Sequence, residues 1–119
     1  MQYVDEQYAG AKMKLRPIYE ALLAMTLQLG PDVKACPCKT IVPLYRSHVF
    51  AQIKPTTNTR IDLGFALRHH KGRFTKRLLD TGGMQKKDRI THRIEIRSLT
   101  DIDGEVQKWL KIAYDLDVK

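Results

Sequence analysis

Apolar residues recur at intervals of three and four positions near the start of the chain, as they do on one face of an α-helix. These residues are Leu15, Ile18, Leu22, Met25 and Leu29. Pro17 lacks the N–H that a helix interior needs, but it fits the first turn of a new helix. We therefore expect a short helix over residues 5–13 and a main helix over residues 17–29, which Gly30 and Pro31 end.

The pattern then changes to an alternation of apolar and polar positions, which is typical of half-buried β-strands. It is clearest over residues 60–68, where one face carries Ile61, Leu63, Phe65 and Leu67. Similar patterns predict strands over residues 40–46, 48–54 and 91–98. Because Pro43 cannot donate to a ladder, it indicates an edge strand or a bulge.

A second helical pattern predicts a helix over residues 101–116. Its apolar stripe consists of Ile102, Val106, Trp109, Leu110 and Ala113. We expect a loop over residues 31–39, a turn over 55–59 and a helical turn over 73–79. This order of elements predicts one α+β domain over residues 1–119, with N-terminal helices, a mainly antiparallel four-stranded sheet and a C-terminal helix in two layers.

The composition fits a globular protein, since 43% of the 119 residues are hydrophobic and 8% are aromatic. No apolar run approaches the roughly 20 residues that a membrane-spanning helix needs. The polar, acidic N-terminus does not resemble a signal peptide. We therefore expect a cytoplasmic protein without membrane contacts.

The net charge of +8 is concentrated in residues 68–91, which hold eight basic and two acidic residues. Such a segment could form a binding surface for nucleic acid or another polyanion. It could equally be a solvated connector, and the presence of a single aromatic residue, Phe74, favours this second interpretation.

Two cysteines, Cys36 and Cys38, flank Pro37 and could form half of a metal site. The chain has no second cysteine pair, and His48 is the nearest histidine in the sequence. A zinc site needs four ligands, and redox motifs usually have the spacing Cys-x-x-Cys. We therefore expect neither a metal nor a cofactor.

The outward face of the sheet is the best candidate site, if the third and fourth predicted strands are neighbours. Arg60 and Asp62 would then share a polar face with Arg93, Glu95 and Arg97. These charges could form cross-strand pairs, each contributing roughly 0.2–1 kcal/mol. Alternatively, the guanidinium groups could bind a carboxylate or phosphate.

Two acids on adjacent strands followed by a basic residue also resemble the site of a metal-dependent nuclease. Here the basic position is Arg97, whose guanidinium does not release a proton, so nuclease activity is disfavoured. His92 falls in register with the inward-facing Ile94 and Ile96. A hydrogen-bonded histidine at the edge of the core is therefore favoured over a catalytic base.

We expect no catalytic residues and no metal ligands, and we select six candidate residues for ligand binding. They are Lys54, Arg60, Asp62, His92, Arg93 and Arg97. The leading hypothesis is a non-enzymatic module that binds an anionic ligand or a polyanion such as nucleic acid through the sheet face and the basic loop. The alternatives are an accessory domain that binds a protein partner, and an enzyme of unrecognised type centred on His92 and Asp62.

Several short segments occur in an order that resembles one known family. They are Gln7-Tyr-Ala-Gly10, Leu15-Arg-Pro-Ile-Tyr19, Phe50-Ala51, Lys54-Pro55, Thr59-Arg-Ile-Asp-Leu-Gly64, His92-Arg93, Trp109-Leu110 and Ala113-Tyr-Asp115. Over about Gln7 to Asp117, the chain resembles the bacterial domain-of-unknown-function family numbered 5655. The resemblance implies no reaction. It implies a domain that is often the C-terminal half of small two-domain bacterial proteins, here in a stand-alone form.

The chain also departs from the family pattern at three places. They are Cys36-Pro-Cys38, His69-His70 and Lys86-Lys87. A role shared by the whole family is therefore not expected for the two thiols, and the basic segment is weaker evidence for a shared function than its charge suggests.

Overall fold

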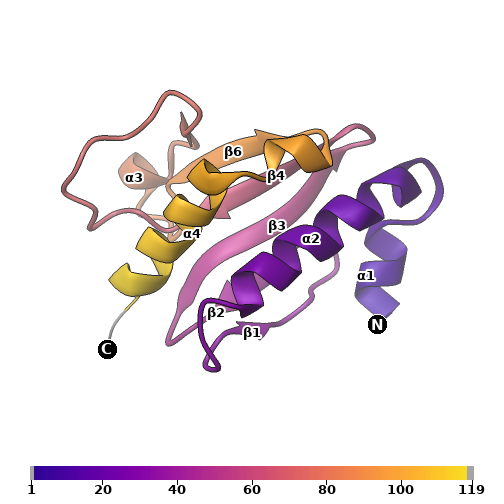
Figure 1. Ribbon diagram of the computed structural model, residues 1–119, viewed down its shortest axis with the longest axis horizontal. Coiled ribbons are helices and arrows are strands. Elements are labelled where there is room, and N and C mark those ends of the chain that lie inside the picture. The colour runs from indigo at the N-terminus through magenta and orange to yellow at the C-terminus, as the bar shows by residue number, and fades with distance from the viewer. Residues whose placement is uncertain (1, 118–119) are drawn as a thin grey trace.

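The computed structural model describes residues 2–117 as a two-layer α+β domain, in which helices cover one face of an antiparallel sheet (Figure 1). Its helices are α1 (Gln2–Gln7), η1 (Gly10–Leu15, 3-10), α2 (Arg16–Leu27), α3 (Gly83–Lys86), η2 (Leu99–Asp101, 3-10) and α4 (Gly104–Leu116). Its strands are β1 (Lys34–Ala35), β2 (Val42–Tyr45), β3 (Val49–Thr57), β4 (Arg60–Phe65), β5 (Leu79–Asp80) and β6 (His92–Ile96).

The sheet has the strand order β1-β2-β3-β4-β6-β5, and all neighbours are antiparallel. The predicted fold class is confirmed, but the prediction of four strands is wrong because the sheet has six. The two additional strands, β1 and β5, have two residues each and lie at the sheet edges. Strands this short carry no measurable alternation, so residues 31–39 and 73–79 gave no sign of them.

The helices differ from the prediction mainly at the N-terminus. The helix expected over residues 5–13 is instead α1 followed by a separate 3-10 helix, η1. The break falls at Gly10, whose φ of +61° lies in the left-handed region that ends a right-handed helix. Pro17 lies in the first turn of α2, as expected, and this helix ends at Leu27.

Strand β3 continues to Thr57, beyond the predicted end at residue 54. The expected turn over residues 55–59 shrinks accordingly to Asn58 and Thr59. Pro55 is accommodated by a register shift between Lys54 and Thr57. Its carbonyl oxygen accepts a hydrogen bond of 2.7 Å from Nζ of Lys12 in η1.

Pro43 lies in β2, which is an interior strand, so of the two alternatives that Pro43 indicated the edge strand is wrong. Its carbonyl accepts a hydrogen bond from the N–H of Cys36, on the β1 side. The missing N–H therefore also faces the β1 side, where the ladder is short, and the cost of the proline is small. A register shift follows between Leu44 and Tyr45, close to the predicted bulge.

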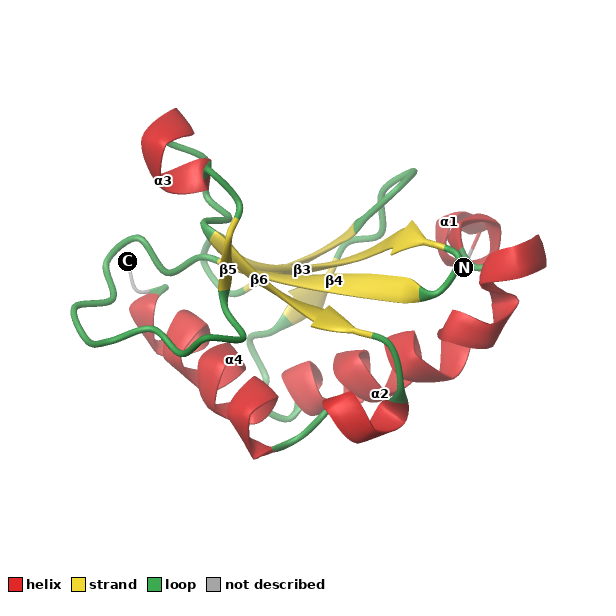
Figure 2. Cartoon of the chain, turned by 90° about the horizontal axis from the view of Figure 1, so that it is seen from above, coloured by secondary structure: helices red, strands yellow, loops and turns green. Residues whose placement is uncertain are grey.

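The core lies between the sheet and helices α2 and α4, which occupy the same side of the sheet (Figure 2). The alternation predicted for β4 is confirmed, because Ile61, Leu63 and Phe65 are fully buried toward the helices. Trp109 of α4 is 1% exposed and belongs to this core, as its helical spacing indicated.

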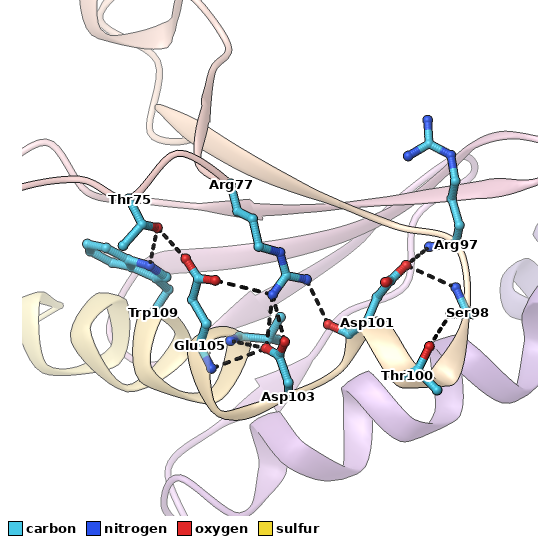
Figure 3. A network of polar contacts seen from close by, with 10 residues as sticks. Thr75, Arg77, Arg97, Ser98, Thr100, Asp101, Asp103, Glu105 and Trp109 are labelled. Carbon is cyan, nitrogen blue, oxygen red and sulfur yellow. Dashed lines mark hydrogen bonds and ion pairs between the residues drawn. The ribbon is translucent and has the colours of Figure 1, made fainter.

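The loop before β5 is attached to the start of α4 by a polar network (Figure 3). Asp103 caps α4 by accepting from the N–H groups of Glu105 and Val106. Nη1 of Arg77 lies 3.0 and 2.9 Å from the two Asp103 oxygens, and Nη2 donates to the Asp101 carbonyl at 2.8 Å. The hydrogen bond from the Val106 N–H is the largest cause of a lowered pKa of Asp103, and Arg77 lowers this pKa further. Burial acts in the opposite direction and is the weaker effect.

A buried carboxylate attaches the end of α4 to the turn between β2 and β3. Asp117 has a side chain that is 1% exposed. Its Oδ2 accepts from the N–H groups of Ser47 and His48 at 3.0 and 2.8 Å, and its Oδ1 lies 2.8 Å from Nδ1 of His48. Burial alone raises the pKa of Asp117, but these hydrogen bonds dominate and lower it.

Candidate functional site

The face of the sheet that α2 and α4 leave open carries the charged residues predicted from the sequence. Figure 2 shows this face on the side from which α3 rises, opposite the two long helices. Strand register aligns Lys54, Asp62 and Glu95 across β3, β4 and β6. The condition set by the sequence, that the strands of Asp62 and Glu95 are neighbours, is therefore met.

Arginines surround the two acids of this face. Arg60 lies between them, with Nε 3.0 Å from Oδ1 of Asp62 and Nη1 3.3 Å from Oε2 of Glu95. Arg93 Nη2 lies 3.4 Å from the same Glu95 oxygen, and Arg97 Nη1 lies 3.2 Å from its Oε1. Both carboxylates are therefore neutralised by residues of the sheet itself.

The centre of this network is packed tightly. The Asp62 side chain is 12% exposed, and Thr56 donates a 2.6 Å hydrogen bond to its Oδ2. Three buried atoms, Oδ1 of Asp62 and the Nε atoms of Arg60 and Arg93, make no hydrogen bond with good geometry to any residue that the structure describes. Charge attraction at 3.0 and 3.8 Å holds these atoms together instead.

Lys54 differs from the arginines, because its ammonium has no ion pair with any of residues 2–117. It is exposed and borders two neighbouring hollows of about 490 and 470 Å³. An exposed, unpaired cation at the edge of a hollow is free to bind an anion from solution.

The larger hollow, which we call the open-face hollow, combines charged and apolar walls. Its charged lining residues are Lys54, Asp62, Asp88, Arg89 and Arg93. Its other lining residues are Ile41, Pro43, Val49, Gln52, Gly64, Thr81 and Ile90. A ligand in this hollow would meet both polar and apolar groups, from the strands and from the segment that carries Asp88, Arg89 and Ile90.

One wall of the open-face hollow comes from a segment far away in the sequence. A Cβ atom added to Gly64 would lie 2.7 Å from Cγ2 of Ile90, so Ile90 packs directly on the bare strand backbone. Arg89 fixes this wall by donating from Nε and Nη2 to the Val49 carbonyl at 3.1 and 2.9 Å. Arg68 donates to the carbonyls of Gly83, Met84 and Asp88, and so holds the segment before it.

The basic segment 68–91 is therefore partly structural. Arg68, Arg77 and Arg89 all bind carbonyl groups of the same domain. Their charges are not freely available to a polyanion. The lysines of the segment, such as Lys86 and Lys87, are exposed.

His92 does not join the other five candidate residues. It lies on the helix-covered face, 6% exposed, with Nδ1 2.8 Å from Oγ1 of Thr91 and its ring stacked on Phe74 at 4.3 Å. Burial is the largest cause of its lowered pKa, which Asp80 opposes by charge attraction. Since Asp62 lies on the opposite face, the structure does not bring together the pair on which the enzyme hypothesis relied.

Sequence reasoning selected Lys54, Arg60, Asp62, Arg93 and Arg97 and missed the wall that closes the hollow. Gly64 was the available signal, because a glycine inside a regular strand often marks the close approach of another segment. The partner segment, which includes Arg89 and Ile90, carried no comparable pattern.

Two further observations concern residues 2–117. They contain no group of three or more His, Cys, Asp or Glu side chains that could hold a metal ion. None of their helices combines the length and the apolar character needed to cross a membrane.

The fold and the site together define an α+β domain with one helix-covered and one open, charged sheet face. The model of the domain of unknown function DUF5655 matches residues 4–117, so the chain belongs to this family. Searches of curated proteins and of solved structures returned no match.

Proposed function

We propose that the domain is a binding module for a small organic anion, which occupies the open-face hollow and binds Lys54. The observation that carries this proposal is the unpaired ammonium of Lys54 at the edge of a hollow of about 490 Å³. Arg93 lines the same hollow and is 34% exposed, so its guanidinium can supply a second contact.

Charge on the open face favours an anion over a cation. Asp62 and Glu95 already have guanidinium partners at 3.0 to 3.4 Å. The hollow is lined by three basic residues, which include the unpaired Lys54, and by two acidic residues, so it retains a net positive charge. Within a partly enclosed hollow, this charge attracts anions more strongly than it would on a flat surface.

The apolar lining favours a ligand with a hydrocarbon part. Ile41, Pro43 and Ile90 border the hollow beside Lys54. No aromatic side chain of residues 2–117 lines it, whereas sites for unpaired nucleic-acid bases commonly use aromatic residues for stacking. A carboxylate or phosphate with a short aliphatic chain combines both requirements.

The test is a titration of the ¹⁵N-labelled protein with hexyl phosphate and, separately, with inorganic phosphate. Hexyl phosphate is expected to shift the backbone amide signals of Gln52, Gly64 and Ile90 and to bind more tightly than phosphate. Lys54→Met is expected to weaken binding about tenfold, which corresponds to the loss of one charge-assisted contact of about 1.4 kcal/mol.

Lys111→Met is the matched control, since Lys111 lies on α4 and pairs with Asp115 at 3.0 Å. It removes the same charge from the other side of the molecule and should leave the affinity unchanged. Equal weakening in the two variants, or no response to hexyl phosphate at millimolar concentration, would contradict the proposal.

A polyanion is the second candidate, because Lys86 and Lys87 are exposed on the segment that forms the wall of the hollow. Single-stranded DNA binding at low salt would then weaken steeply as sodium chloride is added. Loss of this binding in Lys86→Ala/Lys87→Ala, with unchanged binding of hexyl phosphate, would separate the two candidates.

A further inference from the structure

The two cysteines lie on a hairpin directly across from Ile41 and Pro43, which line the open-face hollow. The N–H of Cys36 donates to the Pro43 carbonyl at 3.0 Å, and the N–H of Cys38 donates to the Ile41 carbonyl at 2.8 Å. The ladder between β1 and β2 therefore continues to Cys38. Residues two apart in an extended segment project to the same side, so both thiols share one side of the hairpin.

Both thiols are free and exposed, but their backbone is held firmly. Gln7 of α1 is 7% exposed, and its Nε2 donates to the carbonyls of Cys38 and Ile41 at 2.8 and 3.1 Å. Pro37 between the cysteines is half-buried and restricts the backbone further. A pair of ligands on such a fixed backbone loses little conformational entropy on binding.

The spacing suits a bridging ion better than a disulfide. At a rise of about 3.3 Å per residue, the two Cα atoms are roughly 6.6 Å apart, near the upper limit of the 4.4–6.8 Å range for disulfides. The sulfur of Cys38 lies 3.5 Å from the Cys36 carbonyl oxygen, so the Cys38 side chain is directed toward Cys36. An ion that lies in line between two sulfurs, with bonds of about 2.3 Å, needs the sulfurs about 4.6 Å apart.

The number of ligands selects the ion. Structural zinc needs four ligands, and residues 2–117 offer no cluster of three or more around these thiols. Hard cations such as Mg²⁺ require oxygen ligands, whereas soft thiolates select Cu(I). The sequence-based expectation of no metal rested on the four ligands that zinc needs. This argument does not apply to Cu(I), because two thiolate ligands are sufficient for it.

We propose that Cys36 and Cys38 bind one Cu(I) ion as a two-coordinate bis-thiolate. Each thiol releases its proton when its sulfur bonds to the ion, so one Cu(I) replaces two protons and the complex carries one negative charge. No oxidation or reduction accompanies this step. This proposal does not rest on the anion-binding function proposed above.

The test is a competition for Cu(I) between the reduced protein and bathocuproine disulfonate under anaerobic conditions, followed by the absorbance of the copper–chelator complex. The wild-type chain is expected to withdraw one equivalent of Cu(I). Cys36→Ser and Cys38→Ser are each expected to withdraw at least a hundredfold less. Met13→Leu is the control for soft ligands elsewhere, since Met13 is 64% exposed, and it should match the wild type.

Three results would overturn the proposal. The first is a wild-type chain that withdraws no Cu(I) while both thiols react with Ellman's reagent. The second is full binding by either serine variant, with circular dichroism showing a folded protein. The third is a complex of two chains around one Zn²⁺, measured by light scattering, which would assign the thiols to a shared four-cysteine zinc site.

Discussion

Replacement of Asp117 by alanine should remove a large part of the stability of the domain, because this carboxylate joins the end of α4 to the β2–β3 turn. Its side chain is 1% exposed and accepts three hydrogen bonds of 2.8 to 3.0 Å. Two of the donors are backbone N–H groups, of Ser47 and His48, which alanine leaves without an acceptor.

The magnitude follows from these contacts. A hydrogen bond to a charged group contributes about 1.5–3 kcal/mol, and the contribution of the His48 ring is smaller because this side chain is 57% exposed. We therefore expect Asp117→Ala to lower the free energy of unfolding by about 3–5 kcal/mol. Asp117→Asn keeps one acceptor oxygen for the two backbone N–H groups, so its loss should be smaller.

Urea denaturation followed by circular dichroism measures these differences. Asp115→Ala is the matched control, since Asp115 is 55% exposed and its pair with Lys111 at 3.0 Å is an ordinary i,i+4 contact. This control should lose about 0.2–0.5 kcal/mol. If Asp117→Ala lost no more than Asp115→Ala, the carboxylate could not be the structural link described here.

Acidity provides a second test of the same link. The pKa of Asp117 is lower in the folded protein than its ordinary value of 3.8, so its stabilisation is complete above that value and disappears as the pH falls through the folded pKa. The stability difference between the wild type and Asp117→Asn should therefore be largest near neutral pH and shrink below about pH 4. A difference that stays constant down to pH 2 would show that the charge of Asp117 contributes nothing.

Two further perturbations test the wall of the hollow and the buried histidine. Gly64→Ala should lower the free energy of unfolding, measured by urea denaturation, by about 1–3 kcal/mol, because the added methyl group overpacks against Ile90. Adding Ile90→Ala to the same chain should recover part of that loss. If the effects of the two substitutions simply added, the contact between Gly64 and Ile90 would be excluded. The pKa of His92 is lowered by burial, so its ring should titrate below 6.5 in NMR. The stability of the domain should fall as the pH drops through 6.5, because the unfolded state then binds a proton that the folded state does not. A midpoint above 6.5, or a pH dependence that is unchanged in His92→Gln, would contradict this assignment.

The long elements of the fold could be predicted because each buries one face over many residues. Strand β4 is the clearest case, with apolar residues inward at every second position. Strands β1 and β5 could not be predicted, because two residues show no period and their pairing depends on β2 and β6. The break at Gly10 was also missed, since a glycine near a helix end has the same local pattern whether the chain bends or continues.

The candidate site was predictable to the extent that it follows from alternation within strands. Alternation correctly placed Arg60 and Asp62 with Arg93 on the face that the helices leave open. The same alternation put His92 on the inward face, so its inclusion among the ligand-binding candidates contradicted the pattern itself. Ile90 was missed because its contact with Gly64 joins residues 26 positions apart, and no local signal identifies such a partner.

Pairing, rather than the number of charges, separates the two roles of the basic residues on the open face. Arg60 lies between Asp62 and Glu95, which are directly opposite each other on β4 and β6. Without Arg60, two carboxylates would face each other across the strands, so its main contribution is to stability. Lys54 neutralises no acid of residues 2–117, and its removal leaves no carboxylate unpaired. Stability should therefore depend on Arg60 and anion affinity on Lys54, although both contribute equally to the net charge of the chain.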